Sequence, residues 1–154
     1  MKKFFSHLYF ADPELDVGDV LTSVGVAVKI GPTTQGATMT TISWTSDVSD
    51  MGGEMEQLDA TPLISPVKIN KSGLEDRQAW TIEYFHNDDD FDVLEGYKSS
   101  GDTIKIEVDL PDGAKFENTG VVTGNYMTAI AVNNMLKDKA TIDLSGEWEY
   151  TAGA

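Results

Sequence analysis

The chain has 154 residues, 26 of them acidic and 11 basic, and its formal net charge is −15. This length fits a single domain, residues 1–154, whose core needs no disulfide or metal to hold it together. The lack of cysteine excludes thiol catalysis, a cysteine-based zinc site and a disulfide scaffold. Because Arg77 is the only arginine, the acidic balance argues against a sequence-reading nucleic-acid binder and against binding to an anionic membrane.

The N-terminal segment has the features of a secretion signal for a few residues only. Lys2 and Lys3 precede two phenylalanines, but a serine and a histidine then interrupt the apolar run, and acidic residues follow without a cleavage site. No stretch approaches the roughly 20 apolar residues of a membrane span. We therefore expect a soluble protein that stays in the cytoplasm where it is made until a larger assembly uses it.

Short segments of alternating polarity predict a mainly β protein. Residues 24–30 are apolar and β-branched and end at a Gly-Pro turn pair, while residues 38–48 and 79–86 alternate with the period of a half-buried strand. The side chains expected on the buried faces of the last two segments are Ile42, Trp44, Trp80, Ile82 and Tyr84.

The clearest strand is predicted at residues 103–110. Its apolar face is formed by Ile104, Ile106, Val108 and Leu110, and its polar face by Lys105, Glu107 and Asp109. The following Pro-Asp-Gly predicts a hairpin turn and a return strand. Residues 127–135 and 139–150 are two further candidate strands, the second of them broken at Gly146. Seven or eight short strands favour a β-sandwich or barrel-like fold.

The acidic run "NDDDFDVLEGYKSSGD" (residues 87–102) has two interpretations. The spacing of Asp88, Asp90 and Asp92 copies the start of an EF-hand calcium loop. However, Val93 stands where that loop requires glycine, and Ser99 where it requires a bidentate glutamate. The pattern therefore favours a short helix at about 89–98 over a calcium site.

This helix has the start and stop signals that helices need. Aspartates at residues 88–90 can cap its first turn, and Phe91, Leu94 and Tyr97 give an apolar stripe that can pack on a sheet. Lys98 and the pair Ser100-Gly101 fit a basic last turn and a stop. We expect it to be the one helix of the protein.

Residues 46–78 lack clear periodicity and are predicted to be a long loop. Loops of this length are uncommon in compact domains and usually functional or interfacial. This one carries five large apolar residues, which either cover the protein's own core or pack on another subunit. These residues are Met51, Met55, Leu58, Leu63 and Ile64.

No residue pattern indicates an enzyme or a resident cofactor. The two histidines, His7 and His86, are isolated, and no catalytic-serine, zinc-protease or phosphate-binding motif is present. A monomeric β-sandwich that binds carbohydrate, or another ligand with the help of calcium, is the alternative function. Trp148, between two glutamates, is its candidate exposed residue, whereas Trp44 and Trp80 fall on apolar strand faces.

Several elements occur in a familiar order between Leu58 and Val122. They are the Asp-x-Thr element at 59–61, "SGLEDRQAWTIEY", the acidic helix and "LPDG" before an aromatic strand and a Gly-Val pair. In this order and spacing, the chain resembles the major tail tube proteins of long, non-contractile-tailed bacteriophages. The resemblance covers about Val48 to Tyr150.

The resemblance implies a β-sandwich with one flanking helix that assembles into hexameric rings, which stack into a tube for DNA ejection within the virion tail. It implies that the long loop reaches a neighbouring subunit or ring, and that flexible terminal arms, about 1–20 and 148–154, become ordered on assembly. Expected partners are other copies of the chain and the tape measure, tail terminator and distal tail proteins. The candidate interface residues are Met51, Glu54, Met55, Leu58, Asp59, Thr61, Leu63 and Ile64.

The acidic charge also fits a conduit for DNA. A lining of free lysines and arginines would bind phosphates and retain the DNA, whereas an acidic lining repels it. The polar strand face of Lys105, Glu107 and Asp109 is the candidate lumen surface, and an ordinary solvated outer face is the alternative.

Overall fold

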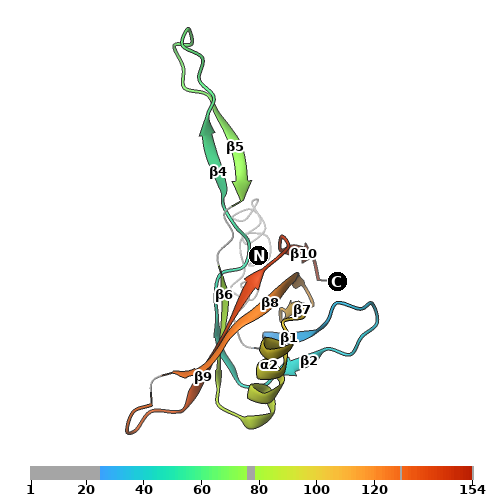
Figure 1. Ribbon diagram of the computed structural model, residues 1–154. Coiled ribbons are helices and arrows are strands. Elements are labelled where there is room, and N and C mark those ends of the chain that lie inside the picture. The colour runs from blue at the N-terminus through green and yellow to red at the C-terminus, as the bar shows by residue number, and fades with distance from the viewer. Residues whose placement is uncertain (1–24, 76–78, 129, 154) are drawn as a thin grey trace, which may run out of the picture.

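The computed structural model describes residues 25–75, 79–128 and 130–153, so the predicted N-terminal arm (1–20) lies outside the described residues. Within these ranges there are ten strands and one helix (Figure 1). The elements are β1 (Ala27–Pro32), β2 (Thr40–Ile42), β3 (Thr45–Val48), β4 (Met55–Asp59), β5 (Asn70–Glu75), β6 (Trp80–Phe85), α2 (Asp88–Ser100), β7 (Thr103–Asp109), β8 (Lys115–Thr128), β9 (Lys137–Leu144) and β10 (Glu149–Thr151). The predicted fold class, mainly β with one helix, is confirmed.

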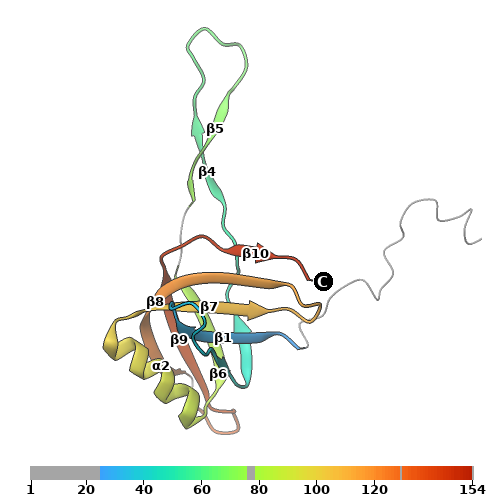
Figure 2. The same ribbon diagram turned by 90° about the vertical axis from the view of Figure 1, so that its right-hand side faces the viewer.

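Eight of the strands form one antiparallel sheet in the order β2-β1-β7-β8-β9-β6-β3, with β10 also paired to β8. The sheet bends along β8, which pairs with β7 through Lys115–Val121 and with β9 through Gly120–Thr128. A Cβ on Gly120 would lie 2.6 Å from the carbonyl oxygen of Asp143, so only glycine permits this close approach of β8 and β9. The bend sets β6 and β9 at a steep angle to β1 and β7 (Figure 2).

The bent sheet encloses one apolar core, and the predicted alternation of β6 and β7 is confirmed. Every second residue of each strand is buried, which places side chains from both halves of the sheet in the same cluster. Its buried members are Val28, Ile30, Ile42, Trp80, Ile82, Tyr84, Leu94, Ile104, Ile106, Val108, Val122, Ala140 and Ile142.

Helix α2 lies against β8, where Leu94 is fully buried. Its N-cap is Asn87, whose side-chain oxygen accepts from the backbone N–H of Asp90 at 2.9 Å, so the prediction that an aspartate caps the helix was wrong. The aspartates instead fill the first turn, where the helix dipole favours negative charge. Gly101 ends the helix with φ 68°, as predicted.

Two predicted strands differ from the structure. Residues 38–48 do not form one strand, because a turn at Ser43 and Trp44 separates β2 from β3. Trp44 has φ 58° and is 73% exposed, so its predicted place in the core was wrong. The predicted strand at 127–135 is also absent from the described residues, since β8 ends at Thr128 and an exposed turn follows.

The predicted long loop at 46–78 contains regular structure. Strands β4 and β5 pair antiparallel, from Met55↔Glu75 to Asp59↔Asn70, and form a hairpin that projects away from the bent sheet (Figures 1 and 2). All five residues of β4 are exposed, so neither face of the strand carries the apolar alternation by which strands are recognised. The prediction of an irregular loop was therefore wrong for these residues.

The predicted C-terminal arm is attached to the sheet over part of its length. Glu149–Thr151 form β10, which pairs with Lys115–Glu117 of β8. Tyr150 also packs on Phe116, with ring centroids 5.1 Å apart. The expectation of a free arm over residues 148–154 therefore does not hold for 149–151.

Candidate interface and lumen surfaces

The hairpin of β4 and β5 carries most of the predicted interface residues. Its pairing has one register shift, between Met55 and Gln57. Towards the tip the ladder continues, because Ala60 N–H donates to the Ile69 carbonyl at 2.8 Å. Beyond this bond, the chain turns through residues 61–68, where Ser65 N–H donates to the Pro62 carbonyl at 2.9 Å. The hairpin is thus ordered by its own hydrogen bonds.

Asp59 and Thr61 build this tip. The Asp59 carboxylate accepts from Thr61 N–H at 2.9 Å. Hydrogen bonding from the Thr61 hydroxyl, together with this backbone bond, lowers the pKa of Asp59. The Thr61 hydroxyl oxygen also accepts from Ile69 N–H at 2.8 Å. Both side chains are therefore occupied in shaping the turn, which explains an Asp-x-Thr element at this position.

The hairpin exposes a set of large apolar side chains. Leu63 and Ile64 at the tip are 106% and 94% exposed, so they make almost no contact with the rest of the chain. The full set, which we call the hairpin patch, is Met55, Leu58, Leu63, Ile64, Val67 and Ile69. Six exposed large apolar side chains on one projecting hairpin indicate a site that another surface covers.

Met51 and Glu54 lie below the hairpin, in the segment between β3 and β4. Met51 is half-buried and packs against the protein's own core. For Met51, the alternative that the apolar residues of this segment cover the core therefore holds. Glu54 is exposed beside it. The structure thus separates Met51 from Met55, Leu58, Leu63 and Ile64, which do not enter the core cluster.

The candidate lumen residues lie in a charged network on the face of the sheet opposite the core. Lys29, Glu107 and Glu117 stand in register across β1, β7 and β8. The ion pairs are Lys29–Asp109, Lys29–Glu107 at 3.6 Å, Lys105–Glu117 at 2.9 Å, Lys115–Glu117 at 3.1 Å and Lys115–Glu107 at 3.8 Å. Three lysines thus face three carboxylates, and this face is balanced in charge rather than acidic.

The two central carboxylates of this network respond in opposite ways. Hydrogen bonds from Lys105 and Lys115 lower the pKa of Glu117 to about 2. Burial, with Asp109 nearby, raises the pKa of Glu107. Lys29, Lys105 and Lys115 each form an ion pair with at least one carboxylate of the network, so none of the three ammonium groups is free to bind a phosphate.

The calcium alternative is not supported by the geometry. Asp88, Asp90 and Asp92 lie on one helix, where a spacing of two residues turns successive side chains by about 200°. Asp90 is buried and accepts from the Asn87 side chain at 2.8 Å, whereas Asp88 and Asp92 are exposed. Among the described residues, no three His, Asp or Glu side chains are grouped to hold a metal ion.

The carbohydrate alternative depended on an exposed Trp148, and this prediction was wrong. Trp148 packs edge-on against Trp80 with ring centroids 5.2 Å apart, and against Phe116 at 6.4 Å. These contacts leave Trp148 only partly exposed and Trp80 is buried, so Trp44 alone among the three tryptophans is an exposed side chain.

His86 has a role that the sequence did not reveal. Its Nδ1 lies 2.6 Å from the carboxylate of Asp138, which is completely buried, and its Nε2 lies 3.4 Å from Asp88. The hydrogen bond with Asp138 raises the pKa of His86. The pair joins β6 to β9 beside the start of α2, so His86 is a structural residue there.

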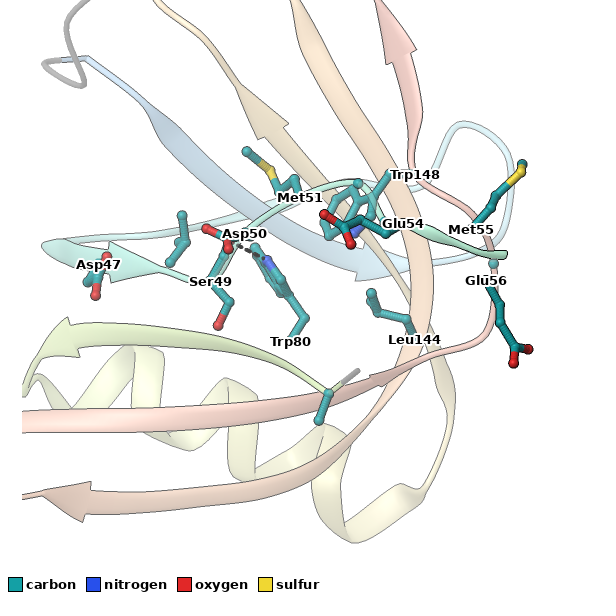
Figure 3. Close-up of a pocket in the computed structure, with 15 residues that line it drawn as sticks. Asp47, Ser49, Asp50, Met51, Glu54, Met55, Glu56, Trp80, Leu144 and Trp148 are labelled. Carbon is teal, nitrogen blue, oxygen red and sulfur yellow. Dashed lines mark hydrogen bonds between the residues drawn. The ribbon is translucent and has the colours of Figure 1, made fainter. Parts of the chain in front are cut away.

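A groove at the base of the hairpin was also not predicted. It has a volume of about 1000 Å³ and lies between the β3–β4 segment, the start of β6 and the β9–β10 segment (Figure 3). Met51, Trp80, Leu144 and Trp148 line it. The groove is assembled from three separate parts of the chain, which is why no local sequence pattern indicates it.

No helix within the described ranges has the length and apolar character needed to cross a membrane.

Comparison with solved structures shows the same fold in assembled tails. The chain is similar to a protein from the "tail of empty GTA particle" refined with C6 symmetry (15% identity, 90% of this chain and 100% of that chain, TM-score 0.62). It is also similar to the SPP1 tail tube protein (12% identity, 86% and 80%, TM-score 0.66) and to a chain of the PVC sheath–tube complex of an extracellular contractile injection system (10% identity, 96% and 97%, TM-score 0.64). No curated protein matches the sequence.

A family model described as "Phage tail tube protein, TTP" matches residues 20–153. The match spans all the strands and the helix described above, including the projecting hairpin. The resemblance seen in the order of the sequence motifs is thereby confirmed, and the chain belongs to the phage tail tube protein family.

Proposed function

We propose that this protein is the structural subunit of a phage tail tube, in which hexameric rings of the chain stack to form the conduit for DNA ejection. The hairpin patch is the observation that supports it most directly. An ordered arm with almost fully exposed leucine and isoleucine at its tip is unfavourable in an isolated molecule, and docking on another copy removes these side chains from water. The sixfold symmetry of the similar GTA tail supports the ring number.

The interface residues fall into two groups in this proposal. Met55, Leu58, Leu63 and Ile64 contact the neighbouring copy directly. Asp59 and Thr61 hold the hairpin tip in the shape that presents them. Glu54 lies at the edge of the contact, and Met51 supports the base of the hairpin from within the subunit.

We also propose that Lys105, Glu107 and Asp109 face the lumen. The network keeps each lysine paired with a carboxylate, so a passing phosphate meets no free ammonium group. Replacing a carboxylate partner would offer the phosphate little net free energy. Six copies, each at −15, carry −90 per ring, which repels DNA at distances within the screening length of about 8 Å. A face balanced in charge within a strongly acidic ring is suited to non-adhesive passage.

The further partners in this proposal are the tape measure protein inside the tube and the tail terminator and distal tail proteins at its ends. Synthesis takes place in the cytoplasm of the bacterial host and the protein then resides in the virion tail. A structural role without catalysis agrees with the family.

Electron microscopy and light scattering of the purified protein over a range of concentrations test this function. We expect rings or tubes with a central channel and sixfold symmetry above a threshold concentration. A species that stays monomeric at every concentration, and also after addition of preformed tube seeds, contradicts the proposal.

A further inference from the structure

The groove at the base of the hairpin has two chemically distinct parts. Its floor is formed by the partly exposed side chains of Met51, Leu144 and Trp148. Trp80, which is only 1% exposed, is fixed behind them by a 3.0 Å hydrogen bond from its indole N–H to the Ser49 carbonyl (Figure 3). The volume of the groove, about 1000 Å³, lies at the upper end of the range for ligand-binding pockets, so it holds several large side chains.

The rim of the groove is acidic. Asp47 lies at one end and Glu56 at the other, with Asp50 and Glu54 between them (Figure 3). All four carboxylates are exposed, and within the part of the chain that the structure describes none of them forms an ion pair. An occupant that complements this groove is therefore aromatic or apolar over part of its length and carries positive charge.

One segment of the chain itself has this composition. Lys2 and Lys3 are adjacent, and five of the next seven residues, from Phe4 to Phe10, are aromatic or leucine. Adjacent lysines are notable in a chain with 11 basic and 26 acidic residues. The segment also precedes the family match, which begins at residue 20, and it lies outside the described residues.

The segment is long enough to reach the groove of its own copy. The described chain begins at Gly25, which lies against Pro111 at the β7–β8 turn, and Phe116 of β8 packs on Trp148 of the groove. Pro111 and Phe116 are five residues apart across this turn, so they are separated by at most about 18 Å. The residues between Phe10 and Gly25 can span about 45 Å when extended.

We propose that residues 2–10 bind in the groove of the same chain, with their apolar side chains against Met51, Leu144 and the partly exposed Trp148 and with Lys2 and Lys3 facing the acidic rim. A tether of this length gives an effective concentration in the millimolar range, which a second copy at micromolar concentration does not match. The proposal concerns the single chain and does not depend on tube assembly.

Disulfide trapping in the full-length protein tests this placement, because the natural chain has no cysteine. The variant F5C/E54C places one thiol in the segment and one on the rim. The control F5C/S99C places the second thiol on the exposed end of α2. We expect F5C/E54C to form an intramolecular disulfide at least about tenfold faster than the control. Both pairs are tethered in one chain, so the difference measures how strongly binding in the groove holds position 5 beside position 54.

Charge reversal at Lys2 and Lys3 gives a second test, which probes the electrostatic part of the proposal. Adding Lys2→Glu and Lys3→Glu to F5C/E54C is expected to slow trapping several-fold, and high salt is expected to slow trapping of the unmodified pair. Circular dichroism checks that each variant keeps the fold of the natural protein.

Three outcomes overturn the proposal. One is equal trapping rates in F5C/E54C and F5C/S99C. Another is unchanged trapping after charge reversal. The third is a mixture of the single variants F5C and E54C that forms covalent dimers as fast as the double variant closes, which assigns the groove to the segment of a second copy.

Discussion

Replacing both tip residues of the hairpin with serine separates assembly from folding. In the single chain, Leu63 and Ile64 are 106% and 94% exposed, so the L63S/I64S variant loses almost no buried area. We therefore expect its free energy of unfolding to stay within about 0.5 kcal/mol of the natural protein. In the tube, the same two side chains would be covered by a neighbouring copy.

The expected loss in assembly follows from that burial. Removing one leucine or isoleucine from water is worth about 1.5–3 kcal/mol, so two give about 3–6 kcal/mol for each hairpin contact. At 1.4 kcal/mol per factor of ten, the association constant should fall by roughly 10²–10⁴. The conservative variant L63M/I64L keeps the apolar area and is expected to assemble like the natural protein.

Sedimentation velocity over a concentration series measures the threshold for assembly, electron microscopy identifies the product, and thermal unfolding of the monomer checks the fold. If L63S/I64S assembles at the same concentration as the natural protein and L63M/I64L, the hairpin tip is not a contact between copies. If the serine variant unfolds several degrees lower, the tip contributes to the fold of the single chain, which its exposure argues against.

Three further predictions concern the stability of the subunit. Because the pKa of His86 is raised in the folded state, the stabilisation from its pair with Asp138 should be complete below pH about 6.5 and be lost as the pH rises through the pKa of the folded state. A Tm of the natural protein that does not change across this pH range argues against this role, as does a Tm that depends on pH in the same way in H86Q. Gly120→Ala should lower the free energy of unfolding by about 2 kcal/mol or more in denaturant titrations, because its Cβ would lie 2.6 Å from a backbone oxygen of β9. Gly96→Ala, on the open side of α2, should instead raise the free energy of unfolding by about 0.5–1 kcal/mol. Equal effects of the two substitutions would contradict the close approach of β8 and β9. Asn87→Ala should cost about 1 kcal/mol through loss of the N-cap bond, and Asn87→Ser should recover most of it in the same assay.

The sequence predicted the parts of the fold in which one strand face is buried. In β6 and β7 every second residue enters the core, and this contrast makes the strands visible as alternation. Helix α2 was visible through its stop at Gly101 and its acidic first turn. Its N-cap was misplaced because asparagine and aspartate accept equally well from the first-turn N–H groups.

The hairpin was missed for the opposite reason. Neither face of β4 is buried in the single chain, so its residues show no alternation, and the same absence of burial makes the hairpin patch a candidate interface. Trp44 was expected in the core and is exposed, because a turn at residues 43 and 44 interrupts the alternation. Trp148 was expected to be exposed and is partly buried, because a break between β9 and β10 precedes it. The groove and the pairing of His86 with Asp138 depend on contacts between distant strands, which a linear pattern does not contain.

The projecting hairpin also has a mechanical consequence. It is a ribbon of only two strands without a second layer behind it, whereas the subunit body is a bent eight-stranded sheet closed over its core. A two-stranded ribbon bends and twists far more easily than a packed body. If such ribbons join successive rings, curvature of the tube is taken up at the joints, and each ring keeps its shape and its bore while the tail flexes.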